Sequence, residues 1–169
     1  MKLLIALIFI IVGQVDIIPP DLQSAIILKT IPYVNNFKEN DTLRIGLAYT
    51  DINETVKFNK YFKSKEVKGK ILIVKRIDIT SNNSIKNIDI LLILPSIQQK
   101  HISSIKKDTE KNDIFSIALT ESLKFVKYGI SMGIVEENGK PKIIANKDGL
   151  KNEGISLDPR FIKLIKFVE

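Results

Sequence analysis

The segment that most constrains the fold is Ile88–Leu94, in which only Asp89 interrupts an otherwise apolar run. A strand with apolar side chains at consecutive positions buries both faces, as strands do in a parallel sheet that helices cover on each side. Three further segments have the composition of strands, namely Leu43–Tyr49, Ile71–Arg76 and Ile114–Leu119. These four segments together predict a mainly parallel sheet.

Amphipathic segments separate the four predicted strands. The first helix is expected to begin at Asp21 and to end or kink at Pro32, because proline cannot continue a helix. A second helix is expected within residues 50–64, and a third opens with Pro95 and Ser96. Because strands and helices alternate, we expect an α/β fold: a single three-layer domain with helices on both faces of the sheet.

The C-terminal part predicts a β-hairpin. Two strand-like segments, 130–137 and 140–145, flank Asn138 and Gly139, a pair that tolerates the positive φ angles of a tight hairpin turn. The hairpin also explains the glycine-rich composition here. A phosphate-binding loop would need Gly-Lys followed by Ser or Thr, whereas Pro141 follows Gly139-Lys140. We therefore expect a hairpin and not a nucleotide site.

Two helices are expected after the hairpin. Asn146 begins a short helix that Gly154 ends, and Asp158 begins the last helix with Pro159 at its first position. The residues expected to form the apolar stripe of that last helix are Phe161, Leu164, Ile165 and Val168.

The first fourteen residues are typical of a signal peptide. Lys2 precedes an apolar run, Leu3–Val12, which is too short to span a bilayer but suits the core of a signal sequence. No A-x-A motif marks the cleavage site, which we place between residues 13 and 20. We expect export to a periplasm, with residues 21–169 as the mature domain. A buried first strand or an uncleaved anchor is the alternative.

Composition excludes several classes of site. The chain has no cysteine and one histidine, so it lacks the side chains for a disulfide scaffold, a thiolate metal site or a multi-histidine zinc site. The formal charge is +7, but lysines occur in ones and twos without aromatic interleaving. We expect no nucleic-acid partner and no cofactor.

Isolated polar residues predict structural roles. His101 lies beside the apolar stripe of a helix, and the pair Glu136-Glu137 points to opposite faces of a strand. The acids that flank strands are expected to form turns and caps, namely Asp78, Asp89 and Asp113. Ser103-Ser104 lacks the Gly-x-Ser-x-Gly context of a nucleophile. We therefore expect no enzyme.

The C-terminal stretch KIIANKDGLKNEGISLDPRFIKLIKF resembles the signature of the YfiR-like family of periplasmic signalling regulators. Similar stretches occur upstream in VKGKILIVKRI, IDILLIL and SIALTESLKFVKYG, and a weaker one in SAIILKTIPYV, so the resemblance covers about residues 22–166. The residues that fall on the family's pattern include Gly69, Gly129, Asn146, Gly154, Asp158, Arg160 and Leu164. Members often carry cysteines that this chain lacks, so a disulfide-based redox response is not expected.

The resemblance implies a function. Members of the family bind the periplasmic sensor domain of an inner-membrane signalling protein, notably a diguanylate cyclase, and hold it inactive. It thus implies a non-enzymatic, homodimeric regulator in cyclic di-GMP signalling, whose partner is a membrane cyclase or kinase. We expect the first helix to supply the dimer or partner contact, through Ile26, Ile27, Leu28 and Ile31.

A small-molecule binding module resembling one lobe of a solute-binding protein is the alternative. Ligands favour the carboxyl ends of strands in open α/β sheets. Tyr49–Asp51 and Pro95-Ser96 end two of the predicted strands, and Ser96 at a helix start would suit an anion.

Overall fold

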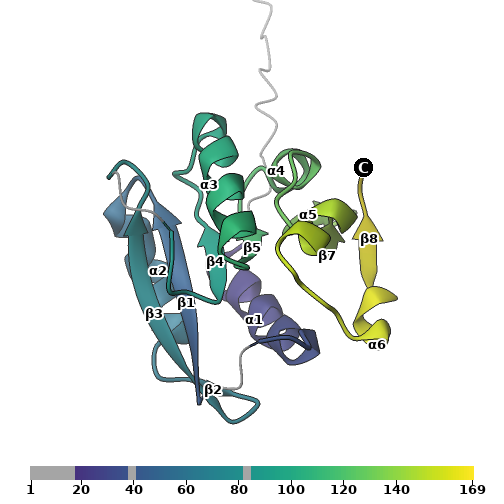
Figure 1. Cartoon of the computed structure of the whole chain (residues 1–169), viewed down its shortest axis with the longest axis horizontal. Coiled ribbons are helices and arrows are strands. Elements are labelled where there is room, and N and C mark those ends of the chain that lie inside the picture. The colour runs from purple at the N-terminus through teal and green to yellow at the C-terminus, as the bar shows by residue number, and fades with distance from the viewer. Residues whose placement is uncertain (1–17, 38–40, 82–84) are drawn as a thin grey trace, which may run out of the picture.

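The computed structural model describes residues 18–37, 41–81 and 85–169, so the predicted signal peptide lies outside the described residues. One eight-stranded sheet runs through the molecule in the order β2-β3-β1-β4-β5-β6-β7-β8 (Figure 1). The strands are β1 Thr42–Tyr49, β2 Glu66–Val67, β3 Lys70–Asp78, β4 Ile90–Ile93, β5 Phe115–Ala118, β6 Met132–Glu137, β7 Lys140–Ala145 and β8 Ile165–Phe167. The helices are α1 Pro20–Thr30, η1 Ile31–Tyr33, α2 Ile52–Phe62, α3 Gln99–Lys111, α4 Ser122–Lys127, α5 Lys147–Asn152 and α6 Pro159–Ile162.

The centre of the sheet is parallel, as predicted. β3, β1, β4, β5 and β6 pair in parallel, whereas β2 and β7 run antiparallel to their neighbours β3 and β6. The order places β1 and β4 side by side although β3 lies between them in sequence. The sheet therefore reverses its winding direction between β1 and β4, the position where doubly wound folds commonly bind ligands.

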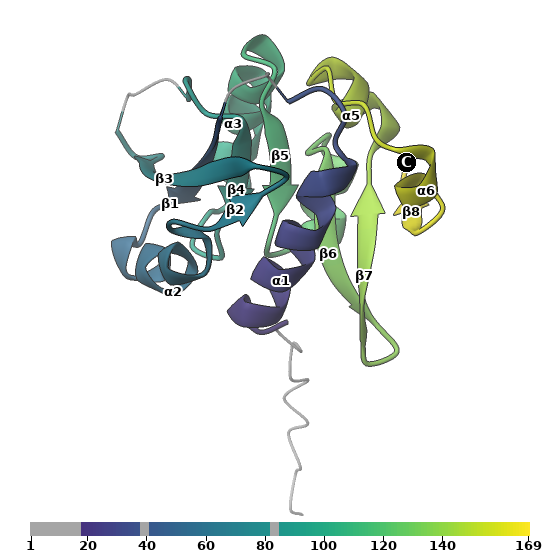
Figure 2. The ribbon, with the colours of Figure 1, turned by 90° about the horizontal axis from the view of Figure 1, so that it is seen from below.

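Helices cover both faces of the sheet, which confirms the three-layer α/β fold. Figure 2 shows α1 and α2 on one side and α3 on the other. In β4, Ile90 and Leu92 pack into the core beneath α1 and α2, while Leu91 and Ile93 pack into the core beneath α3. All four side chains are fully buried. The apolar run therefore forms a strand with two buried faces, as expected.

The predicted hairpin is confirmed, with positive φ angles of 55° at Asn138 and 71° at Gly139 between β6 and β7. Asn146 caps α5 and Asp158 caps α6, as predicted, because each side chain accepts a hydrogen bond from a backbone N–H of the first turn. Gly154 follows α5 with a φ of 67°, as expected of a residue that ends a helix.

Three helix predictions are wrong in detail. The first helix starts at Pro20, so Asp21 lies within its first turn and is not the cap. The third starts at Gln99, and Ser96 instead accepts hydrogen bonds from the backbone N–H groups of Thr50 and Asp51. The last helix is a single turn that ends at Ile162.

The apolar stripe predicted for the last helix does not form. Ile165 belongs to β8, which pairs in parallel with β7, and the side chain of Leu164 is 68% exposed. β2, β8 and α4 were not predicted. No helix among the described residues is long and apolar enough to cross a membrane.

Candidate functional site

Several residues of the family-like pattern have structural roles. The side chain of Asn146 accepts a 2.8 Å hydrogen bond from the Gly149 backbone N–H and donates a 3.0 Å bond to the carbonyl oxygen of Val126. It therefore joins α4 to α5. Gly69 and Gly129 both have positive φ angles, which explains glycine at these two positions of the pattern.

The segment after α1 pairs with the segment between α5 and α6. The side chain of Asn36 bonds the Gly154 carbonyl and the Ser156 N–H, and the ring of Tyr33 stacks on Phe161 at a centroid distance of 5.1 Å. These contacts join the N-terminal and C-terminal ends of the domain. Asn36 was not identified from the sequence.

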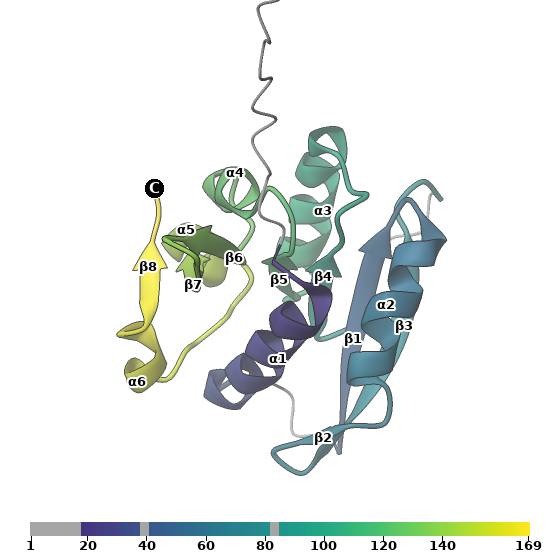
Figure 3. The same ribbon diagram turned by 180° about the vertical axis from the view of Figure 1, so that it is seen from behind.

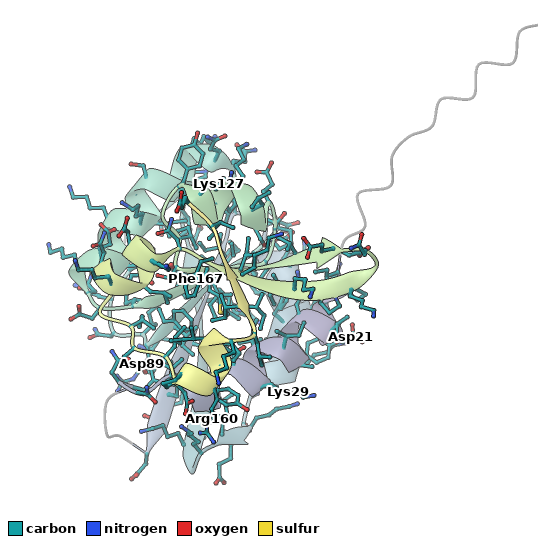
Figure 4. All side chains as sticks on the ribbon, turned by 90° about the vertical axis from the view of Figure 1, so that its right-hand side faces the viewer. Asp21, Lys29, Asp89, Lys127, Arg160 and Phe167 are labelled. Atoms are coloured by element: carbon teal, nitrogen blue, oxygen red, sulfur yellow. The ribbon has the colours of Figure 1, made fainter. Side chains whose placement is uncertain are left out.

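Arg160 and Asp158 form an exposed ion pair beside this junction. The guanidinium Nη2 lies 2.7 Å from the Asp158 Oδ2, and its hydrogen bonds lower the pKa of that carboxyl to about 2. Figure 4 looks onto this C-terminal face and labels Arg160 and, on β8, Phe167. Because Asp158 also caps α6, the pair fixes the turn that leads into β8.

A buried carboxyl group lies beneath α5. Glu153 is fully buried, and its carboxylate accepts hydrogen bonds from the Ser116 N–H at 2.9 Å and from the hydroxyls of Ser116 and Ser131, each at 2.5 Å. Burial is the largest influence and raises the pKa of Glu153. The three donors lie on or beside β5 and β6, so this residue fastens α5 to the sheet. No local sequence signal marks it.

The strand ends expected to bind a small ligand are bonded to each other. The Ser96 hydroxyl accepts hydrogen bonds from the backbone N–H groups of Thr50 and Asp51 at 3.0 and 3.2 Å. The Ser96 N–H, which was expected to face an anion, donates to the Glu54 carboxylate at 2.8 Å. The Glu54 carboxylate therefore occupies the Ser96 N–H that an anion would need, and Ser96 does not lie at a helix start.

A cavity of about 810 Å³ lies instead between the end of β5, α4, β6 and the start of α1. Its lining includes Gln23, Leu119, Ser122, Lys127 and Ile134. Gln23 is buried, and its Nε2 donates a 2.8 Å hydrogen bond to the Leu119 carbonyl, which attaches α1 to the end of β5.

The four apolar residues expected to contact a partner are not equivalent. Ile27 and Ile31 are 0% and 3% exposed and belong to the core, so the surface contact predicted for them does not exist in this structure. Ile26 and Leu28 are half-buried against the same core. The exposed large apolar residue of α1 is Leu22, at 41%.

The isolated polar residues take ordinary positions. His101 is half-buried on α3, and Glu137 pairs with Lys166 at 2.6 Å.

The acids that flank strands form turn contacts. Asp89 accepts a 2.7 Å hydrogen bond from the Arg44 N–H. The Asp78 carboxylate accepts hydrogen bonds from the N–H and the hydroxyl of Thr80, which lower the pKa of Asp78. Asp113 lies in a turn with a positive φ. Ser103 and Ser104 are exposed on α3. The described residues contain no cluster of three or more side chains suited to a metal ion.

Strand β3, which is next to the two-residue edge strand β2, presents exposed apolar side chains. Ile71 and Ile73 are 54% and 41% exposed, and a groove of about 600 Å³ runs beside the strand (Figure 3 shows β3 at one side of the sheet). We call it the β3 groove. It is lined by Asn59, Lys63, Ser64, Ile71, Leu72, Ile73, Val74 and Arg76.

Comparison with known proteins shows the family to which the chain belongs. A family model described as YfiR/HmsC-like matches residues 20–165. A search of curated proteins found no match. The fold resembles a crystal structure of a conserved domain protein from Vibrio cholerae O1 biovar eltor strain N16961, with a TM-score of 0.61 and 11% identity. That match covers 89% of this chain and 60% of the other, so the chain spans less than two thirds of that structure and the likeness concerns the fold alone.

Proposed function

Because this chain belongs to the YfiR/HmsC-like family, we propose that it is an exported, non-enzymatic regulator that binds the periplasmic sensor domain of an inner-membrane signalling protein and represses it. The proposed partner is of the diguanylate cyclase type, which places the protein in cyclic di-GMP signalling. The observation that carries the proposal is the extent of the family match, residues 20–165, which includes almost all of the described chain.

The surface of the domain is compatible with protein binding. Exposed apolar side chains occur on several elements, including Leu22 on α1, Leu123 on α4 and Ile71 on β3. The polar strand ends, by contrast, bond to each other. A contiguous exposed apolar surface is the feature that marks a protein-binding site, and Ile71 and Ile73 lie next to each other on one face of β3.

Repression then follows from a difference in affinity. A regulator shifts a partner between two states only as far as it binds one state more tightly, and moving a partner from 1% to 99% inactive requires a difference of about 10⁴-fold. A homodimer, which the family resemblance implies, would present two copies of the binding surface and so increase the apparent affinity for a partner that offers two sites.

Capture from membranes tests this proposal. The purified protein is immobilised, incubated with detergent-solubilised membranes of its own organism and eluted for mass spectrometry. Recovery of an inner-membrane protein with a periplasmic sensor domain and a cyclase domain is expected, with Ile27→Asp as the unfolded control. Recovery of no membrane signalling protein would contradict the proposal.

The cavity beside β5 favours a second candidate function, a small-molecule binding module. It lies at the carboxyl end of a parallel strand, where open α/β sheets commonly bind ligands, and its lining includes two cations, Lys124 and Lys127, and two acids, Glu121 and Glu136. A thermal-shift screen with amino acids and small anions separates the two functions. A ligand would raise the melting temperature in a concentration-dependent manner, and Leu123→Glu would abolish that increase.

A further inference from the structure

The outer edge of β3 is largely unpaired by other strands. β3 spans nine residues, but β2 pairs with it only at Lys70 and Ile71. No other strand among the described residues pairs with this edge, because β1 occupies the opposite one. An exposed edge of this length is a surface on which another strand can be added.

The ladder with β1 determines which backbone groups face outward. Ile71 and Ile79 donate their N–H groups to the β1 side, at Asp41 and Tyr49, whereas Leu72 donates to Lys65 on the outer side. In a parallel ladder the bonding residues alternate along the strand. The backbone N–H and C=O groups of Val74 and Arg76 therefore point away from β1, along the β3 groove.

Apolar side chains accompany these backbone groups. Ile73 is 41% exposed on the face of β3 turned away from α2, while Leu72 packs into the core on the α2 side. Asn59 of α2 and Lys63, the residue that follows this helix, form the wall of the groove. An added strand would thus gain main-chain hydrogen bonds from the edge and side-chain contacts from Ile71 and Ile73, the combination that characterises β-augmentation.

The charge of this region identifies the kind of strand that fits. Residues 57–76, which form most of α2 and β3 with β2 between them, contain eight lysine or arginine residues and a single acid, Glu66. This stretch alone therefore carries as much excess positive charge as the formal +7 of the whole chain. The groove lining itself includes Lys63 and Arg76 and no carboxylate.

A second copy of the chain is a poor occupant of this groove. Pairing two β3 edges would bring two strongly basic segments together, and like charges across an interface are unfavourable. An acidic strand would instead neutralise the segment and associate faster through electrostatic attraction. We propose that the β3 groove binds an extended, acidic segment of a partner protein as an additional strand beside β3. This rests on the proposed function, which supplies the partner.

A pair of peptides tests the proposal directly. One is a capped ten-residue peptide of alternating valine and glutamate, and the other has lysine in place of each glutamate. Each is titrated into the isotope-labelled protein while the backbone amide resonances are followed by NMR. We expect saturable shifts at Val74 and Arg76 with the glutamate peptide, and at least tenfold weaker binding of the lysine peptide.

Three variants separate strand addition from general charge effects. Val74→Pro removes an outward N–H at a position where an edge strand tolerates proline, and Arg76→Glu reverses a charge in the groove. Each should weaken binding of the glutamate peptide at least tenfold. Lys100→Glu makes the same change of charge on the exposed first turn of α3 and should alter the affinity less than twofold. If Val74→Pro fails to fold, Arg76→Glu supplies the result.

Several outcomes would overturn the inference. These are the absence of saturable shifts with the glutamate peptide, shifts centred away from β3, or equal binding of both peptides. Binding to anionic lipid vesicles that Arg76→Glu abolishes, without peptide binding, would identify a membrane surface instead. If the unmodified protein and Arg76→Glu capture the same membrane sensor equally, this inference fails while the proposed function stands. If the unmodified protein captures none, the proposed function fails and the peptide result is unaffected.

Discussion

The hydroxyl of Ser116 donates a 2.5 Å hydrogen bond to the carboxylate of Glu153, and both side chains are fully buried. Ser131 donates a second hydroxyl to the same carboxylate. No positively charged group accompanies this acid among the bonds of the described residues, so hydrogen bonds alone compensate its burial. The desolvation penalty for the ionised carboxylate outweighs the stabilisation by these hydrogen bonds, so the pKa of Glu153 is raised.

The first prediction concerns the pH dependence of stability. Because the folded-state pKa of Glu153 is raised, its contribution to stability is fully present below the unfolded pKa and is lost as the pH rises through the folded pKa. The stability of the unmodified protein relative to Glu153→Gln should therefore fall as the pH rises above the ordinary glutamate pKa of 4.5. Urea unfolding of both proteins between pH 4 and pH 8 measures this difference. Parallel pH profiles would show that Glu153 does not titrate differently in the folded state.

Removing the carboxyl group altogether should destabilise the protein at about pH 4, where the contribution of Glu153 is fully present. Glu153→Ala leaves the Ser116 N–H and the two serine hydroxyls without their acceptor, and we expect a loss of about 1–3 kcal/mol in the free energy of unfolding. Glu66→Ala, at an exposed acid, is the control. Equal stabilities of the two variants would contradict the structural role assigned to Glu153.

Gly149 provides a second test of how α5 meets the sheet. A Cβ atom there would lie 2.6 Å from the backbone carbonyl oxygen of Gly129, and backbone cannot move aside as a side chain can. Gly149→Ala should therefore lower the free energy of unfolding by about 1–3 kcal/mol, although alanine favours helices. Asp148→Ala, an exposed neighbour on α5, should change it far less. A stabilised Gly149→Ala would contradict this close approach.

The next prediction concerns α1, the helix expected to contact a partner. Ile27 is fully buried, so Ile27→Asp places a carboxylate in the core and should prevent folding. Leu22 on the same helix is 41% exposed, and Leu22→Asp should leave the circular dichroism spectrum and the melting temperature nearly unchanged. A folded Ile27→Asp protein would show that α1 is packed less closely than described.

Ser96 tests the junction between β1 and β4. Ser96→Ala removes the acceptor for the N–H groups of Thr50 and Asp51, and we expect a loss of about 1 kcal/mol in the free energy of unfolding. Ser103→Ala, on the exposed side of α3, should cost much less. The stability of both variants is measured by urea unfolding. If Ser96→Ala is as stable as the unmodified protein, the hydroxyl is not needed at this junction.

The sequence was informative where a local pattern determines structure. The continuous apolar run of β4 indicated burial on both faces, and Asn138-Gly139 indicated the hairpin, because only a few residues tolerate its positive φ angles. The caps at Asn146 and Asp158 were predicted because their side-chain oxygens can accept a hydrogen bond from a backbone N–H of the first helical turn.

Contacts between residues distant in sequence determine the features that the sequence did not predict. Leu164 and Ile165 continue a helical spacing, but pairing with β7 draws Ile165 into a strand that its own sequence does not indicate. The burial of Glu153 depends on Ser116 and Ser131, which lie 37 and 22 residues away in sequence. Ile26 and Ile27 are alike in sequence, and only the packing of α1 against the sheet decides which of them is buried.

Cellular cyclic di-GMP tests the central claim most directly. The gene is deleted in its own organism, and the nucleotide is quantified by mass spectrometry in the parent, in the deletion strain and in a complemented strain. The proposed repression predicts a rise in cyclic di-GMP on deletion and a return to the parental level on complementation. Equal concentrations in the three strains, under conditions in which the protein is produced, would contradict it.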